Sequence, residues 1–96
     1  MALSLLQVTI GASATQATAT STPCAYALIQ ADDGNSNPAF FGGSSVTSAN
    51  GIRLHNSATV PERDYIGPFP QNLFDLSELY IAGTQNEKVN ILYVQH

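Results

Sequence analysis

The clearest strand pattern is that of Asp75-Leu-Ser-Glu-Leu-Tyr-Ile-Ala-Gly-Thr-Gln-Asn-Glu-Lys-Val-Asn-Ile-Leu-Tyr-Val94. Residues 79–81 supply the aromatic and β-branched side chains of a first strand, and residues 89–94 supply those of a second. The polar residues 83–87 between them have the length of a loop that joins hairpin strands. The stretch therefore predicts two strands around a short turn.

A further core strand is predicted over residues 24–31. One face of it would carry Cys24, Tyr26, Leu28 and Gln30, and the other face would carry Ala25, Ala27, Ile29 and Ala31. Both faces are mostly apolar, which predicts a strand covered on both sides. Residues 89–94 are also largely apolar on both faces, so they are expected to form a central or covered strand and not a free edge.

The remaining segments are short and extended, and glycine or proline often interrupts them. Residues 5–10 alternate weakly, residues 39–42 end in a double glycine, and Asn50-Gly51 is the strongest tight-turn dipeptide. No eleven-residue window has helical periodicity, although residues 73–79 allow one short turn. The sequence thus predicts an all-β fold: a small β-sandwich, jelly-roll-like, of six to eight short antiparallel strands with little or no helix.

The chain of 96 residues is expected to form one domain. Within it, residues 1–22 form an N-terminal strand and an extended arm rich in Ala and Thr, and residues 23–96 form the sandwich. The small side chains of residues 11–22 cannot fill a core alone. This arm is therefore either an edge strand of its own fold or a strand added to a neighbouring molecule.

Charged residues make up only 10% of the chain, against about 25% in an ordinary soluble domain. The net charge is −4, and the basic residues Arg53, Arg63 and Lys88 are scattered. No basic patch can neutralise a phosphate backbone, so nucleic-acid binding is not expected. A surface that is polar but poor in ions suits burial against protein partners.

Neither a disulfide nor a membrane segment is expected. Cys24 is the only cysteine, so no intrachain disulfide exists, and synthesis in a reducing cytoplasm is favoured. Residues 1–10 are apolar but too short to span a membrane, and no positive charge precedes them as in a signal peptide.

Residues 32–37 are rich in Asp and Asn, but they make a poor calcium loop. The spacing of Asp33, Asn35 and Asn37 suits three calcium ligands. However, Pro38 stands where the loop needs glycine, and Ser44 stands where it needs glutamate. A plain turn is the better interpretation.

No other set of residues makes a convincing metal or catalytic site. His55 and His96 lie far apart in the sequence, and with the single cysteine they do not match the spacing of any zinc-binding motif. Asp75 and Glu78 form a carboxylate pair only in principle, and Asp75 is expected to cap the turn that follows it. The sequence therefore predicts a protein that is not an enzyme and has no cofactor.

Protein contact is the function that the residues favour, with sugar binding as an alternative. The chain has no tryptophan for stacking on a sugar, and three of its four tyrosines lie in core-like strands. The apolar residues 65–70 lack strand periodicity and are either an exposed contact patch or a segment that closes the sandwich. The candidate partner-interface residues in this stretch and in the arm are Thr15, Thr18, Thr20, Tyr65, Ile66 and Phe69.

Four stretches carry a family resemblance: Phe40-Phe-Gly-Gly-Ser-Ser-Val-Thr47, Ser48-Ala-Asn-Gly-Ile-Arg-Leu54, Asp75-Leu-Ser-Glu-Leu-Tyr-Ile-Ala-Gly83 and Val89-Asn-Ile-Leu-Tyr93. Together they resemble small structural proteins of tailed bacteriophages. The likeness is one of overall pattern and covers over half of the chain, and residues 61–70 match no part of it.

The resemblance implies a β-sandwich protein of the virion. It would be a capsid decoration (cement) protein that binds the outside of the capsid shell and stabilises it, made in the host cytoplasm. Its partner would be the major capsid protein or another virion protein, and the chain would form a homo-oligomer, with a trimer favoured. The resemblance equally admits a β-module of the tail, neck or fibre, including one that binds carbohydrate.

Overall fold

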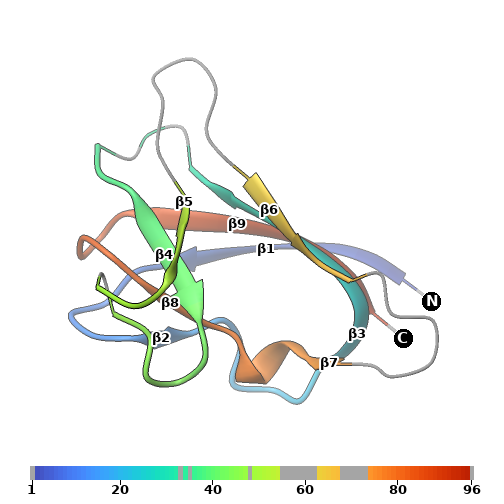
Figure 1. Cartoon of the computed structure of the whole chain (residues 1–96). Helices are drawn as coiled ribbons and strands as arrows, with labels where there is room; N and C mark the ends of the chain where they lie inside the picture. The colour runs from blue at the N-terminus through green and yellow to red at the C-terminus, as the bar shows by residue number, and fades with distance from the viewer. Residues whose placement is uncertain are drawn as a thin grey trace.

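The structure, a computed structural model, describes residues 2–32, 34, 36–47, 49–54, 63–67 and 74–95 (Figure 1). These residues form nine strands and one turn of 3-10 helix. The elements in chain order are β1 (Ala2–Thr9), β2 (Thr15–Gln16), β3 (Pro23–Ala31), β4 (Ala39–Gly42), β5 (Ile52–Leu54), β6 (Arg63–Ile66), β7 (Phe74–Asp75), η1 (Leu76–Glu78), β8 (Tyr80–Ala82) and β9 (Lys88–Gln95).

The strands form two antiparallel sheets that pack as a sandwich. The five-stranded sheet has the order β1-β9-β3-β6, and β7 also pairs with β3; the four-stranded sheet has the order β2-β8-β4-β5. With β7 set aside, the first strand pairs with the last, the second with the last but one, and so inward to β4 and β5. This nesting is that of a jelly roll, so the predicted all-β, jelly-roll-like sandwich is confirmed. The structure describes nine strands, one more than the predicted six to eight, because it includes β2 and β7, which have only two residues each.

The predicted terminal hairpin is wrong, because β8 and β9 do not pair with each other. β8 lies between β2 and β4 in one sheet, and β9 lies between β1 and β3 in the other. The loop between them is held by the end of β1: the Ile10 N–H donates to the Glu87 carbonyl and the Asn86 N–H donates to the Ile10 carbonyl, each at 2.8 Å. Gly83 and Asn86 have positive φ angles, which let the chain turn from one sheet to the other.

The core fills the space between the sheets. The largest fully buried side chains come from both sheets, from η1 and from the residue after β1: Ile10, Cys24, Ile29, Leu54, Leu76, Ile81, Val89 and Ile91. β9 pairs with β1 along eight residues and with β3 on its other side, which confirms that it is a central strand.

The predicted arrangement of faces on β3 needs two corrections. Ala27, Ile29 and Ala31 are buried as one face, but Leu28 on the opposite face is half-buried, so the described residues do not cover the second face fully. In addition, Cys24 lies on the core side, because the register shifts at a bulge before Tyr26. A bulge inserts one residue into a strand and so reverses the alternation of its side chains.

Residues 11–22 belong to the sandwich of their own chain. Within them, β2 pairs with β8 at the edge of the four-stranded sheet, and the Ala17 N–H donates to the Leu79 carbonyl at 2.9 Å. Ala17 and Thr22 are buried. Of the two alternatives for this arm, the structure shows the edge strand of its own fold.

The turn before β5 requires a glycine at position 51 because a side chain would not fit there, and not because the backbone has a positive φ. The Gly51 N–H donates to the Thr47 carbonyl at 3.1 Å, and neither Asn50 nor Gly51 has the positive φ of a type I′ hairpin turn. A Cβ on Gly51 would lie 2.6 Å from Cγ2 of Val46 and 2.8 Å from Cβ of Phe40. Glycine is required here because these two buried side chains occupy the space.

Gly51→Ala is therefore expected to destabilise the protein by about 1–3 kcal/mol, because the Phe40 Cβ cannot move without its backbone. Gly43→Ala is the matched control, since a Cβ there has no heavy atom within 4 Å. Urea unfolding of both variants measures the difference. Equal midpoints for the two variants would contradict the steric argument.

Candidate functional site

The outer face of the five-stranded sheet carries an apolar surface. By register, Leu3, Val94 and Tyr26 lie side by side on β1, β9 and β3, and Leu5, Leu92 and Leu28 form the next row. Leu3 and Leu5 are 69% and 74% exposed, and the other four side chains are half-buried. We call these six residues the apolar half-face. They contain no charged side chain, and the described residues of the chain do not cover them fully.

The other half of the same face is polar. Gln7, Asn90 and Gln30 form the next row by register. The Gln7 Nε2 donates to Asn90 Oδ1 at 2.9 Å, and the Asn90 Nδ2 donates to Asp32 Oδ1 at 3.1 Å. The face is thus divided along the strand direction, with a hydrogen-bonded polar border at one end. An apolar surface with a polar border is typical of a protein interface.

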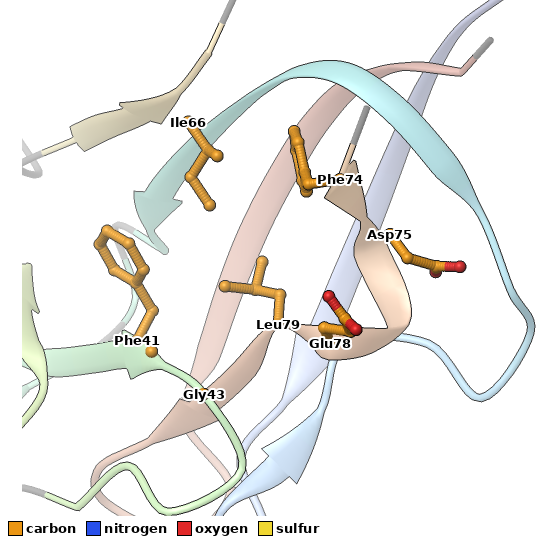
Figure 2. Close-up of a pocket in the computed structure, with 8 residues that line it drawn as sticks. Phe41, Gly43, Ile66, Phe74, Asp75, Glu78 and Leu79 are labelled. Carbon is orange, nitrogen blue, oxygen red and sulfur yellow. The ribbon is translucent and has the colours of Figure 1, made fainter. Parts of the chain in front are cut away.

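An apolar pocket of about 300 Å³ lies between the two sheets (Figure 2). Phe41 of the four-stranded sheet faces Ile66 and Phe74 of the five-stranded sheet, and Leu79 lies between them. Glu78 is exposed at its border. The described lining has few polar groups that would orient a small ligand, so the pocket is less informative than the apolar half-face.

Asp75, which also borders this pocket, is a structural residue. Its carboxylate accepts hydrogen bonds from the Ser21 hydroxyl, from the Thr22 N–H at 2.9 Å, and from the N–H and hydroxyl of Ser77 at 2.9 and 2.7 Å. These bonds, the one from Ser21 foremost, hold the pKa of Asp75 far below its usual value. The predicted capping of the turn is confirmed, and the same carboxylate also ties residues 21 and 22 to η1.

Cys24 is buried beside this network. Its thiol donates to the Thr22 carbonyl at 3.1 Å. Burial raises the pKa of Cys24, and the nearby negative charge of Asp75 raises it further. The thiol is therefore protonated near neutral pH and has little nucleophilic character.

The backbone of the acidic loop at residues 32–37 is held by carboxylates, one from the loop itself and one from Glu87. Asp32 Oδ2 accepts from the Gly34 N–H at 3.1 Å, and the Glu87 carboxylate accepts from the N–H groups of Ser36 and Asn37. Asp33 and Asn35 lie outside the described residues. Within the described residues, no group of three or more His, Cys, Asp or Glu side chains is placed to hold a metal ion.

The threonines predicted at the interface are engaged in local turns. The Thr15 hydroxyl accepts from the Gly11 N–H at 2.8 Å and donates to the Ser13 carbonyl at 3.1 Å. The Thr18 hydroxyl accepts from the Thr20 N–H at 3.3 Å. Thr20 is exposed, and Thr15 and Thr18 are half-buried at the edge of the four-stranded sheet.

The other predicted interface residues belong to the other sheet. Tyr65 lies opposite Leu28 on β6, and Ile66 is half-buried against the core and lines the pocket. Phe69 lies outside the described residues. Thr15 and the β6 residues thus occupy edge strands of different sheets.

The six residues of the apolar half-face are not among the residues that the sequence predicts for a partner interface. Their signal in the sequence was the apolar character of residues 24–31 and 89–94 on both faces. The pattern predicts cover on both faces, whereas the described residues bury the inner face of each strand and leave the outer face half-buried.

The described part of the chain contains no helix that is long and apolar enough to cross a membrane. Comparisons with protein-family models, with curated proteins and with solved structures find no match.

Proposed function

We propose that this chain is a non-enzymatic structural protein of a bacteriophage virion, of the capsid decoration (cement) type. It binds the major capsid protein or another virion protein on the outside of the shell and stabilises the particle. The apolar half-face is the observation that carries the proposal. The low charge of the chain and the family resemblance of its sequence also support it.

The mechanism is the burial of apolar surface against the shell. Leu92 lies at the centre of the apolar half-face, with Leu5 and Leu28 as its neighbours in the same row. Each Å² of apolar surface removed from water contributes about 25 cal/mol, and a stable interface buries about 800 Å² on each partner. Many copies on one shell add these contacts and oppose separation of the shell subunits.

Three carboxylates of the described residues hold their own chain, which supports a structural role for them. Asp75 accepts four hydrogen bonds from its own chain, and Asp32 and Glu87 hold backbone N–H groups of the loop beside them. Such carboxylates stabilise a fold. A catalytic acid or base needs a free position for its substrate.

Leu92→Lys tests the proposal, because it places a charge at the centre of the apolar half-face. We expect its copy number in purified virions, measured by quantitative mass spectrometry, to fall at least tenfold relative to the wild type. Gln85→Lys adds the same charge on an exposed loop and is expected to retain the wild-type copy number. Thermal unfolding of both isolated variants verifies that the fold is retained.

Two outcomes would overturn the proposal. The first is absence of the wild-type chain from purified virions. The second is a copy number of only a few per particle, which would indicate a tail, neck or fibre component instead.

A further inference from the structure

β1 is a long edge strand with an open side. Its eight residues pair with β9, and the described residues provide no strand on its other side. Ala2 to Thr9 includes no proline, glycine or charged residue. Proline and charged side chains are among the features with which proteins protect an edge strand from pairing with another chain, and β1 has neither.

The hydrogen-bonding groups on this open side can be assigned by alternation. The Ile10 N–H donates to the Glu87 carbonyl, so the backbone groups of Ile10 point toward the β9 side. In an antiparallel strand, successive residues point their N–H and C=O groups to opposite sides. The backbone groups of Leu3, Leu5, Gln7 and Thr9 therefore point away from β9.

The charge and the side chains of β1 favour a second copy of this chain as the occupant. Each chain has a net charge of −4, so two copies repel each other least where acidic groups are absent, as along β1. Leu3 and Leu5 flank the open edge and are the most exposed large apolar side chains of the described residues. When a second copy is rotated about a two-fold axis, the N–H and C=O groups of the two antiparallel edge strands are complementary to each other.

We propose that β1 pairs antiparallel with β1 of a second copy, about a two-fold axis at Leu5. In this register Leu5 lies opposite Leu5 of the second copy, and Leu3 lies opposite Gln7. Three such residue pairs exchange about six backbone hydrogen bonds, within the range of roughly 5–15 for a typical interface. The two five-stranded sheets become one continuous sheet, and the two apolar half-faces join on one side of it.

Cysteine cross-linking tests the register on the isolated protein. Leu5→Cys places the two thiols across the axis, where paired Cα atoms are about 5.5 Å apart and a disulfide fits. Leu3→Cys is the matched control, since the two copies of residue 3 are then about 14 Å apart. We expect a disulfide-linked dimer from Leu5→Cys at a yield at least tenfold above that of Leu3→Cys. The wild type, whose only cysteine is buried, provides the blank.

An equimolar mixture of Leu3→Cys and Gln7→Cys is expected to cross-link as a heterodimer. Absence of a Leu5→Cys dimer, or equal yields from Leu5→Cys and Leu3→Cys, would overturn the proposal.

The oligomeric state gives a second measurement that needs no covalent bond. Leu5→Lys sets two like charges against each other at the axis, and its exposed position leaves the fold intact. We expect the dimer dissociation constant, from sedimentation equilibrium, to rise at least tenfold for Leu5→Lys and to be unchanged for Gln85→Lys. A wild-type monomer, or a trimer that Leu5→Lys leaves unaltered, would contradict pairing through β1. Both tests use the isolated chain, so they are independent of whether it binds a virion.

Discussion

Ile91→Ala is expected to lower the free energy of unfolding by about 2–5 kcal/mol. Ile91 is fully buried at the centre of β9, which lies between β1 and β3, and its side chain belongs to the main core cluster. Truncation removes three buried carbon atoms and leaves a cavity that two flanking strands prevent from closing. A domain of this size has only about 5–15 kcal/mol of stability, so the loss is a large part of the total.

The measurement is thermal and urea unfolding at fixed protein concentration, with Ile52→Ala as the control. The control makes the same change in a side chain that is 54% exposed on β5, and it is expected to cost less than about 1 kcal/mol. For a domain of this length, each kcal/mol lowers Tm by about 4–8 °C, so Ile91→Ala should melt at least about 8 °C below the wild type. Similar losses for the two variants would show that residue 91 is not in the core.

Asp75→Ala is expected to give the second large effect. The substitution removes the acceptor of four hydrogen bonds at once and releases the contact between residues 21–22 and η1. The Thr22 N–H then has no acceptor, although Thr22 is buried. We expect Tm at pH 7 to fall by roughly 5–10 °C, as for the loss of a strong cap in a domain of this size.

The pH dependence of stability identifies the charge of Asp75 as the cause. The folded-state pKa of Asp75 lies well below the unfolded value of about 3.9, so the unfolded chain takes up the proton more readily. The stabilisation by this carboxylate is therefore complete above about pH 5, and it is lost progressively as the pH falls through the folded-state pKa. Acid should destabilise the wild type more than Asp75→Ala, and their Tm values should converge toward pH 2.

Glu78→Gln is the control for this pH series. Glu78 is exposed at the end of the same 3-10 turn, and its substitution should leave the acid dependence of Tm unchanged. If Asp75→Ala retains the full acid dependence of the wild type, the assignment to Asp75 is wrong.

Local residue patterns were sufficient to predict the class of fold and several of its parts. Short β-rich segments broken by glycine and proline indicated a sandwich, and Asp75 was recognised as a cap from the residues that follow it. The pairing of the strands could not be predicted in this way. Residues 79–94 have the local pattern of a hairpin, yet β8 pairs with β4 about forty residues earlier, and β9 pairs with β1 at the other end of the chain. Local propensity contains no information on such distant partners.

For the candidate site too, local residue patterns were visible in the sequence, whereas the arrangement of distant residues was not. The sequence shows that residues 24–31 and 89–94 are apolar on both faces. It does not show which of the two faces the opposite sheet buries. The bulge near Tyr26 places Cys24 on the core side, and no residue pattern in the sequence predicts this bulge. The hydroxyls of Thr15 and Thr18 accept hydrogen bonds from local backbone N–H groups, and these bonds are formed by the turns around β2 and not by the residue pattern alone.

By itself the sequence determined that this chain is an all-β domain with few charges, a single unbridged cysteine and strands that are apolar on both faces. These properties follow from composition and from the two-residue period of a strand, which are local. Only the tertiary structure decided that residues 75–94 divide between two sheets and that, among the described strands, β1 is an open edge beside the apolar half-face. Both depend on which distant strands pair, and that choice is made by the burial of side chains from both sheets against each other.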